Sequence, residues 1–271
     1  MFDGQNDILR EKSGIDLSRS PDRMREYLHS LNGVLRQELP LPNPTPIQEL
    51  TCKLGRDVRE VSNPEWFSDF ADAVLDYFDS SLESYSADVE GEGHCKYVMD
   101  LDSYTRMRLR NTGGSLCNIC VELSNNVLLS AEIREHPVVQ QLTKCLWYYN
   151  AYLNDIYTYS KEQDEPHSRN LIMVFMRSES MSLPEAAWKA VNLTNAIARD
   201  FMELETHLPV WEDEQKAYVL HRYVQGMKEF MSGTLYFHSL SKRYRLREAP
   251  FPELRDVNIP VRAKAEHFKG V

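Results

Sequence analysis

The most informative nine residues of this chain read Asn154-Asp155-Ile156-Tyr157-Thr158-Tyr159-Ser160-Lys161-Glu162. On a helix, Asn154, Thr158 and Glu162 lie on one face, because residues four apart stack along the axis. We call these three residues the polar ladder. Their amide, hydroxyl and carboxylate oxygens form the ligand set that a hard divalent cation prefers. The same spacing is also typical of a solvated helix face, so the interpretation depends on the flanking residues.

The residues before the polar ladder are strongly aromatic. Positions 147–153 read Trp147-Tyr148-Tyr149-Asn150-Ala151-Tyr152-Leu153, which is unusual for the flank of a plain surface helix. A few polar groups beside apolar and aromatic walls are typical of a ligand pocket. The flanks therefore favour a binding site over a solvated face.

The nine residues also fill every position of a known motif, N-D-[LIV]-x-[ST]-x-x-[KR]-E. This is the second metal motif of class I terpene synthases, and the chain resembles that family. The resemblance implies Mg²⁺ ligands at Asn154, Thr158 and Glu162, with three Mg²⁺ ions in the complete site. It also implies a contact between Lys161 and a substrate diphosphate.

A second signal lies upstream, at Arg108. Arg106 and Arg110 can share one helix face because they are four residues apart, so Arg108 points elsewhere and can face inward. An inward arginine beside a divalent cation is suited to hold a phosphate with its forked guanidinium. The resemblance agrees, because the family places a diphosphate-sensing arginine 46 residues before the first residue of the metal motif, and Arg108 precedes Asn154 by that spacing.

The residues after Arg108 predict a break in the helix. They read Asn111-Thr112-Gly113-Gly114. A helix that unwinds at a glycine pair exposes a carbonyl whose negative dipole can stabilise a carbocation. The resemblance implies that Asn111 and Thr112 are the linker and effector positions of the substrate pocket.

The last signal is the aromatic stretch from Phe230 to Tyr244. By itself it is typical of a helix with a basic end that suits its dipole. It also resembles the C-terminal motif of the same family, N-L-x-W-x-x-x-[ST]-x-R-Y, although Thr and Phe stand where Asn and Trp are usual. The resemblance implies that Arg243 and Tyr244 bind the diphosphate and close the pocket. Phe237 would then offer a π face to cationic intermediates.

The first residues carry two carboxylates four apart, Asp3 and Asp7. They suit the start of a helix, whose dipole favours acids. They also resemble the family's Asp-rich metal motif, D-D-x-x-D, with Gly4 in place of the second Asp, and this would make Asp3 and Asp7 further Mg²⁺ ligands. On that interpretation the leading helices of the family are absent here. The uncovered apolar surface would then need a partner or a second copy of the chain.

Composition indicates an ordinary globular protein. Of the 271 residues, 42% are hydrophobic and 27% charged, and a net charge of −10 without a basic run argues against nucleic acid as a partner. No apolar run reaches the roughly 20 residues that span a bilayer. We therefore expect a cytoplasmic protein without stable membrane insertion. Cys117 and Cys120 form a C-x-x-C, but no second pair supports zinc, so we expect buried free thiols.

Helical periodicity recurs along the sequence, and no stretch alternates with the period of a strand. We predict helices at 24–37, 47–61, 64–80, 186–205 and 213–226. An acidic, glycine-containing stretch at 86–93 predicts a loop. The expected fold is all-α, one domain over 1–271 with an irregular tail at 246–271. The resemblance makes this the class I terpenoid synthase bundle around a central apolar cavity.

The function that the resemblance implies is that of a Mg²⁺-dependent lyase, a terpene cyclase. It would ionise a prenyl diphosphate, with farnesyl diphosphate as the best match, and cyclise the carbocation to a sesquiterpene. The first alternative is a truncated, non-catalytic relative that acts through a partner or an oligomer. The second is a chain-elongating prenyltransferase, which the missing second Asp-rich motif disfavours.

Overall fold

The computed structural model describes residues 20–37, 42–89, 100–163, 170–245 and 249–251. Within these ranges the chain is all-α, with ten α-helices, one short 3-10 helix and no strand, which confirms the predicted fold class. Asp3 and Asp7 lie outside the described residues, as does nearly all of the predicted tail. The prediction of a single domain over the whole chain therefore stays a prediction.

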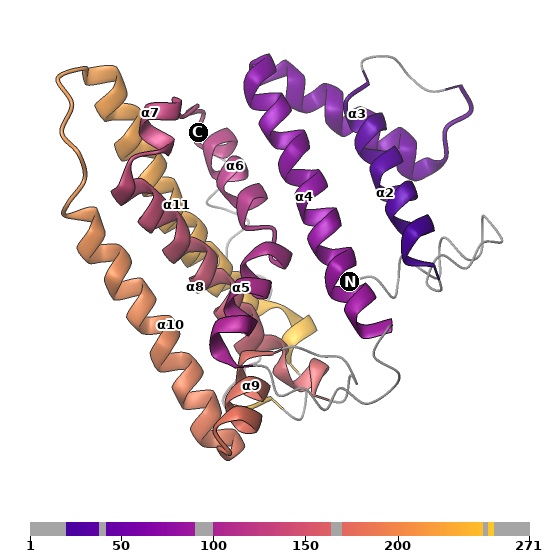
Figure 1. The fold of residues 1–271 in the computed structure, drawn as a ribbon. Coiled ribbons are helices and arrows are strands. Elements are labelled where there is room, and N and C mark those ends of the chain that lie inside the picture. Colours follow the sequence, from indigo (N-terminus) through magenta and orange to yellow (C-terminus); the bar gives the residue numbers. More distant parts are fainter. Residues whose placement is uncertain (1–19, 38–41, 90–99, 164–169, 246–248, 252–271) are drawn as a thin grey trace.

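The helices follow one another in the order α2 Pro21–Leu35, α3 Pro46–Glu60, α4 Pro64–Val89, α5 Leu101–Asn111, α6 Gly114–Ser124, α7 Ala131–Arg134, α8 Pro137–Glu162, α9 Leu171–Ser178, α10 Leu183–Glu205, α11 Glu214–Leu240 and η2 Lys242–Tyr244. The long helix α8 is the axis of the bundle, since it packs against α5, α6, α7, α9, α10, α11 and η2. Helices α2, α3 and α4 form a second group beside it, joined to the bundle where α4 meets α5 and α6 (Figure 1).

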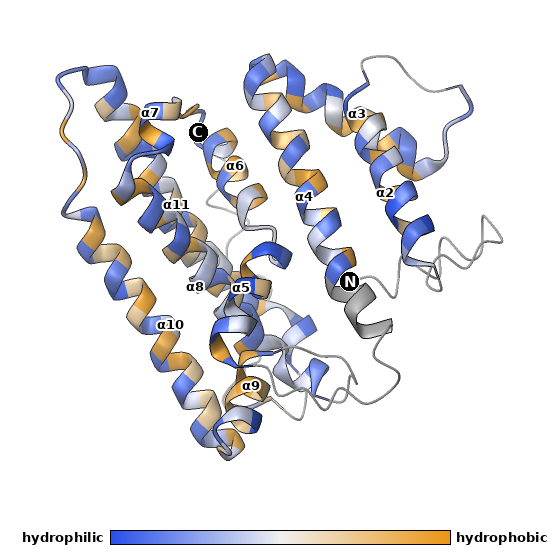
Figure 2. Ribbon diagram, in the orientation of Figure 1, coloured by the Kyte–Doolittle hydropathy of each residue, from blue (hydrophilic) through white to orange (hydrophobic). Residues whose placement is uncertain are grey.

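Two of the three apolar clusters among the described residues involve the main bundle. The larger one surrounds α8 and includes Leu142 and Leu146, which are fully buried, and Phe175 of α9. The second joins the α2–α4 group to α6 through residues such as Trp66 and Ile119. Hydrophobic residues recur at intervals along helices such as α4 and α10 (Figure 2). This amphipathic pattern is what positions the buried face of each helix.

Local capping signals set where the helices begin. Ser182 donates its backbone N–H and its hydroxyl to the Glu185 carboxylate at 2.9 and 2.6 Å, at the start of α10. The ring Nδ1 of His136 accepts the Val138 N–H at 3.3 Å and so caps the start of α8.

The predicted break at the glycine pair is confirmed. Helix α5 ends at Asn111, Gly113 adopts a left-handed conformation with φ of 70°, and α6 begins at Gly114. A Cβ on Gly114 would lie 2.7 Å from the Trp147 ring, so the absence of a side chain lets α6 approach α8. Both glycines are therefore required, one for its backbone angle and one for close packing.

Two predicted boundaries were wrong. The stretch predicted as a loop at 86–93 is helical as far as Val89, because its first glycine comes only after that residue. The helix predicted to end at Gly226 continues to Leu240. Gly226 serves packing instead, since a Cβ there would lie 2.2 Å from the amide nitrogen of Asn125 beside α6.

The prediction of free thiols is confirmed where the structure describes it, but the expected burial is wrong for Cys120, which is exposed. Cys117, Cys120 and Cys145 are free thiols, and burial raises the pKa of Cys117 to about 11, so this thiol is a poor metal ligand at neutral pH. In the described part of the chain, no helix is both long enough and apolar enough to span a membrane.

We expect Gly114→Ala to destabilise the protein by about 1–3 kcal/mol, because the added Cβ displaces the Trp147 ring from a packed position. Gly233→Ala is the matched control. It lies inside α11, and apart from its chain neighbours and the nearby backbone of its own helix no atom lies within 4 Å of the added Cβ. This variant should therefore leave stability unchanged or raise it by about 0.5–1 kcal/mol. Urea unfolding compares the two variants, and equal stability would contradict the packing role.

Candidate functional site

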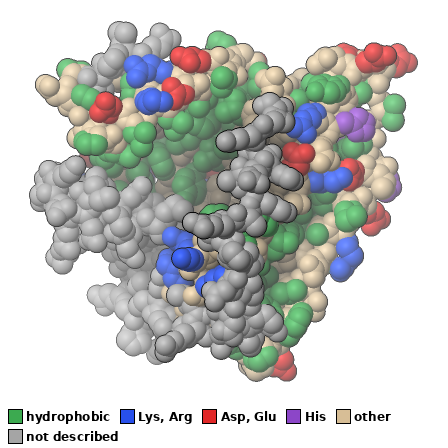
Figure 3. Space-filling view, turned by 180° about the vertical axis from the view of Figure 1, so that it is seen from behind, with side chains coloured by type: hydrophobic (Ala, Val, Ile, Leu, Met, Phe, Trp, Pro, Cys, Tyr) green, Lys and Arg blue, Asp and Glu red, His purple; other side chains and the backbone are tan. Residues whose placement is uncertain are grey.

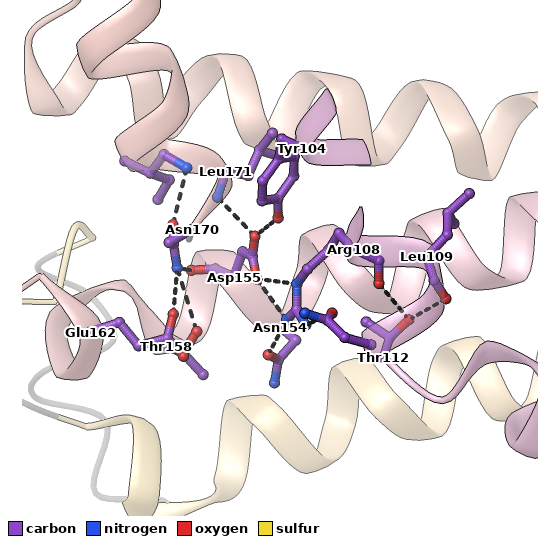
Figure 4. Close-up of polar contacts among 12 residues, drawn as sticks. Tyr104, Arg108, Leu109, Thr112, Asn154, Asp155, Thr158, Glu162, Asn170 and Leu171 are labelled. Atoms are coloured by element: carbon purple, nitrogen blue, oxygen red, sulfur yellow. Dashed lines mark hydrogen bonds and ion pairs between the residues drawn. The ribbon is translucent and has the colours of Figure 1, made fainter. Parts of the chain in front are cut away.

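A buried ion pair between α5 and α8 is the centre of the candidate site (Figure 4). Arg108 donates from Nη2 and Nε to Oδ1 of Asp155, at 2.8 and 3.0 Å. The Arg108 side chain is 14% exposed and that of Asp155 is 1% exposed. Arg108 therefore faces inward, as the spacing of the three arginines predicted.

The second oxygen of Asp155 connects α8 to α9 by a hydrogen bond. Oδ2 accepts the backbone N–H of Leu171 at 2.8 Å and the hydroxyl of Tyr104, which lies one turn before Arg108 on α5. One carboxylate thus joins three helices. Since both of its oxygens accept hydrogen bonds, these donors favour the carboxylate form of Asp155.

Burial works against this charge on both partners. Full burial, and then the neighbouring Glu162 carboxylate, raise the pKa of Asp155 well above its usual range. Burial also lowers the pKa of Arg108, while Glu162 raises it. The pair is therefore held by mutual attraction and donor groups that oppose a large desolvation cost.

Asn154, the first residue of the polar ladder, lies directly beside this pair. Its Oδ1 accepts from Nη2 of Arg108 at 2.9 Å. Its Nδ2 lies 3.2 Å from Nε2 of His238, on α11. Burial lowers the pKa of His238, which favours the neutral ring. The proposed metal ligand is thus held from two sides, by α5 and by α11.

The other two ladder residues meet on a buried asparagine. Asn170 is fully buried, and its Nδ2 donates to Glu162 Oε2 at 3.1 Å and lies 3.5 Å from Thr158 Oγ1. The same nitrogen donates to the Asp155 carbonyl at 2.7 Å, while Asn170 Oδ1 accepts the Ile172 N–H at 3.0 Å. The oxygens of Thr158 and Glu162 therefore converge within reach of one atom.

This arrangement fits a hard divalent cation. Among the described residues, no group of three or more His, Cys, Asp or Glu side chains could hold a metal. The polar ladder is a different kind of set, because amide and hydroxyl oxygens accompany one carboxylate. Asn154, Thr158 and Glu162 supply oxygens only, along one face of α8, as a magnesium-type site requires.

The predicted linker and effector positions also contact Arg108. Nη1 of Arg108 donates to Asn111 Oδ1 at 3.0 Å. Thr112 donates its hydroxyl to the backbone carbonyls of Arg108 and Leu109, at 3.1 and 3.2 Å. Both residues lie between Arg108 and the helix break at Gly113 along the chain.

Residues of the C-terminal motif lie beside the part of α8 that carries the polar ladder. Tyr244 is buried, and its ring packs against those of His238, Tyr157 and Phe237. Arg243 is exposed, with its guanidinium 5.9 Å from the Tyr244 ring centre. Phe237 is 57% exposed, so its predicted role in the pocket stays a prediction.

Lys161 is also exposed, on the last turn of α8. The structure therefore brings Arg108, Asn111, Asn154 and Tyr244 into one contact network. It leaves the two predicted diphosphate-binding cations Arg243 and Lys161 at the surface. Their predicted contacts with a ligand stay predictions.

Four residues of the network were given no role from the sequence: Tyr104, Asp155, Asn170 and His238. Asp155 was named only as part of the nine-residue motif. Tyr104 shares a helix face with Arg108, four residues on, which was the available signal. Asn170 was readable as a cap before α9. His238 lies inside the C-terminal motif but at a position without a motif residue, so nothing in the sequence marked it.

A cavity of about 650 Å³ lies between α4, α6, α7, α8 and α11. Trp147 and Ser115 line it close to the helix break, and Glu122 and Arg134 line it as well. Figure 3 shows hydrophobic side chains around a hollowed area on one face of the molecule. The lining of the 650 Å³ cavity is nevertheless not purely apolar, because acidic side chains such as Glu122 share it with aromatic and aliphatic ones.

A second, apolar cavity of about 350 Å³ lies on another side of α8. It is lined by α8, α10 and α11 residues such as Leu153, Trp188 and Leu235, together with Phe251. The Phe251 ring packs against that of Trp188, with centres 5.4 Å apart. The linings of these two cavities do not include the polar ladder among the described residues.

We expect Asp155→Asn to cost about 3–5 kcal/mol of stability, because it leaves the Arg108 guanidinium buried without its counter-ion. Tyr104→Phe, which removes one neutral donor from the same carboxylate, should cost less, about 1.5–3 kcal/mol. Urea unfolding measures both variants. Equal losses would show that the ion pair does not carry the network.

Glu122 gives a prediction of pH dependence. Burial raises the pKa of this carboxyl above its usual value of about 4.5, although the Leu129 N–H and Arg134 act in the opposite direction. The folded chain then keeps the proton to higher pH than the unfolded chain. The contribution of Glu122 to stability is therefore full below the unfolded pKa and is lost as pH rises through the folded pKa.

Glu122→Gln should accordingly gain stability relative to the parent as pH rises from about 4 to about 8. Glu26→Gln, at an exposed position of α2, is the control and should show no such trend. Urea unfolding across this pH range tests both, and a constant difference for Glu122→Gln would contradict the argument.

Comparisons with known proteins identify the family. Residues 12–200 match the family model described as terpene synthase family 2, C-terminal metal binding. The chain is 29% identical over 147 residues to sesquiterpene synthase Agr1 of Cyclocybe aegerita, covering 54% of this chain and 42% of that protein. It is 24% identical over 233 residues to germacrene A synthase of Nostoc punctiforme, covering 84% of this chain and 69% of that protein.

Among solved structures, germacradien-4-ol synthase from Streptomyces citricolor has a similar fold, with a TM-score of 0.72 and 19% identity. The similarity covers 89% of this chain and 74% of that one. The chain thus spans less than half the length of the fungal relative, and most of the bacterial structure. The family model spans the region from before α2 into α10, which includes Arg108 and the polar ladder, and the chain therefore belongs to terpene synthase family 2.

Proposed function

We propose that this protein is a Mg²⁺-dependent terpene synthase that converts a prenyl diphosphate, farnesyl diphosphate above all, to a cyclic sesquiterpene with release of diphosphate. The observation that carries the proposal is the contact between Arg108 of α5 and Asn154 of the polar ladder, at 2.9 Å. It unites an anion-binding side chain with a metal-type ligand set. The relatives named sesquiterpene synthases support the choice of substrate length.

Asn154, Thr158 and Glu162 would hold Mg²⁺ through their side-chain oxygens, and Asp3 and Asp7 would supply ligands to the rest of a three-ion cluster. Bound Mg²⁺ neutralises the charge that develops on a departing diphosphate. Asn170 supports the site, because its buried amide nitrogen already contacts both the Thr158 and the Glu162 oxygens. The protein would thus bind the cation with little reorganisation of these two ligands.

The diphosphate would be held by Arg108, Lys161, Arg243 and Tyr244. A guanidinium suits this role because it donates two parallel hydrogen bonds to a phosphate. Arg243 and Lys161 are exposed and can approach a ligand from the surface, whereas Arg108 lies inside. Together they would stabilise the leaving anion from both sides.

Arg108 is also suited to signal that the diphosphate has bound. It contacts Asn111 through its side chain, and its backbone carbonyl accepts the Thr112 hydroxyl. A shift of Arg108 toward an anion would therefore pull on both residues at the end of α5. The carbonyls of the break at Gly113 would then be aimed at a developing carbocation.

The hydrocarbon chain would occupy the cavity of about 650 Å³ that Trp147 and Ser115 line beside the break. This volume lies within the range of about 300–1,000 Å³ that is common for small-molecule sites. Phe237 would offer its ring from the Tyr244 side of the site.

The test is incubation of the purified chain with Mg²⁺ and farnesyl diphosphate, followed by gas chromatography of an organic extract. A terpene product is expected. Asn154→Ala/Glu162→Ala should lower its formation by about 10³-fold, since several kcal/mol of charge stabilisation correspond to that factor. Asn192→Ala/Glu203→Ala, which removes the same residue types from the exposed side of α10, is the matched control and should retain activity.

The alternative is a non-catalytic relative that acts through a partner or an oligomer. It would be favoured if the folded protein formed no product from farnesyl, geranyl or geranylgeranyl diphosphate. It would be excluded by a product that disappears in the ladder variant and persists in the α10 control.

A further inference from the structure

His238 occupies a position in the site that neither the motif nor the proposed mechanism uses. It lies near the end of α11 and is 6% exposed. Its ring stacks almost parallel on Tyr244, with centres 4.6 Å apart and an angle of 17° between the planes. The Tyr157 ring lies 5.4 Å away on α8. The contacts with these two rings restrict the orientation of the His238 side chain.

Those partners define its tautomer. Nδ1 lies 2.8 Å from the backbone carbonyl oxygen of Thr234, which can only accept a hydrogen bond. Nδ1 therefore carries the proton, and Nε2 of the neutral ring presents a lone pair. That lone pair faces Nδ2 of Asn154 at 3.2 Å, so the amide donates to the ring.

The amide of Asn154 is consequently fixed at both ends. Its Oδ1 accepts from Arg108 and its Nδ2 donates to His238. Turning the amide over would place two donors together at Arg108 and two acceptors together at His238. Only the observed orientation satisfies all of these groups. Arg108 and His238 together therefore determine which atom of Asn154 points toward α5 and which toward α11.

This choice matters for a hard cation, because an amide binds Mg²⁺ through its oxygen and not through its nitrogen. We propose that His238 is a positioning residue for the metal site: its Nε2 holds the Asn154 amide with Oδ1 as the available ligand atom, and its ring seats Tyr244 beside that ligand. The inference rests on the proposed function, since it requires that the polar ladder binds Mg²⁺.

The geometry favours positioning over proton transfer. Both ring nitrogens of His238 already have partners within the protein, Thr234 and Asn154. A general base needs a lone pair directed at the substrate proton. The surrounding groups are the rings of Tyr157, Phe237 and Tyr244, which seat the imidazole and supply no carboxylate.

The test is calorimetric titration of the folded full chain with Mg²⁺ in the presence of inorganic diphosphate, which does not depend on turnover. His238→Phe keeps a stacking ring but removes the acceptor, and should weaken Mg²⁺ binding by about 10–100-fold, as loss of a residue that orients a metal ligand does. His238→Gln carries an acceptor close to the position of Nε2, and should restore binding to within about threefold of the parent.

His238→Asn supplies a second, polar comparison. Its shorter side chain can donate to the Thr234 carbonyl but does not reach Asn154, so binding should stay as weak as in His238→Phe. Thermal unfolding of every variant checks that the fold is retained. His221→Phe, at an exposed position of the same helix, is the control and should bind Mg²⁺ like the parent.

Parent-like Mg²⁺ affinity in both His238→Phe and His238→Asn would overturn the proposal. So would equal weakening in His238→Gln and His238→Asn, because the acceptor would then not be the group that matters. If the parent itself does not bind Mg²⁺ with diphosphate, the metal site of the proposed function fails as well. A positioning defect alone is thus distinguished from the absence of a metal site.

Discussion

The structure depends on one buried ion pair, between Arg108 and Asp155. Two charges removed from water cost several kcal/mol each unless their remaining hydrogen-bonding capacity is used. Here the carboxylate also accepts from Tyr104 and from the Leu171 backbone, which brings α5, α8 and α9 to a common point. The positions of the neighbouring site residues on these three helices therefore depend on the ion pair.

The polar ladder shows how such positioning works. Helical spacing places Asn154, Thr158 and Glu162 on one face, but it does not decide where their oxygens point. Neighbouring helices decide that, through Asn170 before α9 and His238 on α11. A site of this kind is built by two layers, one of ligand atoms and one of residues that hold them.

The break between α5 and α6 connects the charged end of the site to its cavity. Gly113 turns the backbone, and Gly114 lets α6 approach Trp147 of α8. The same turn carries Thr112, which is bonded to the carbonyl of Arg108. A ligand that moves Arg108 would therefore also displace the backbone around Thr112 and Gly113, next to the wall of the cavity. The two parts of the site are connected by a few residues of backbone and not by a long chain of contacts.

Local patterns in the sequence were sufficient for the all-α class, for the helix break at Gly113 and for the inward direction of Arg108. Capping signals, backbone angles and helical spacing act over a few residues, so they can be read directly. The roles of Gly226 and His238 could not be read this way. Each depends on which helix lies opposite, and only tertiary packing brings α11 against α6 and Asn154. The sequence determined the available ligand atoms, and the packing of neighbouring helices decided their orientation.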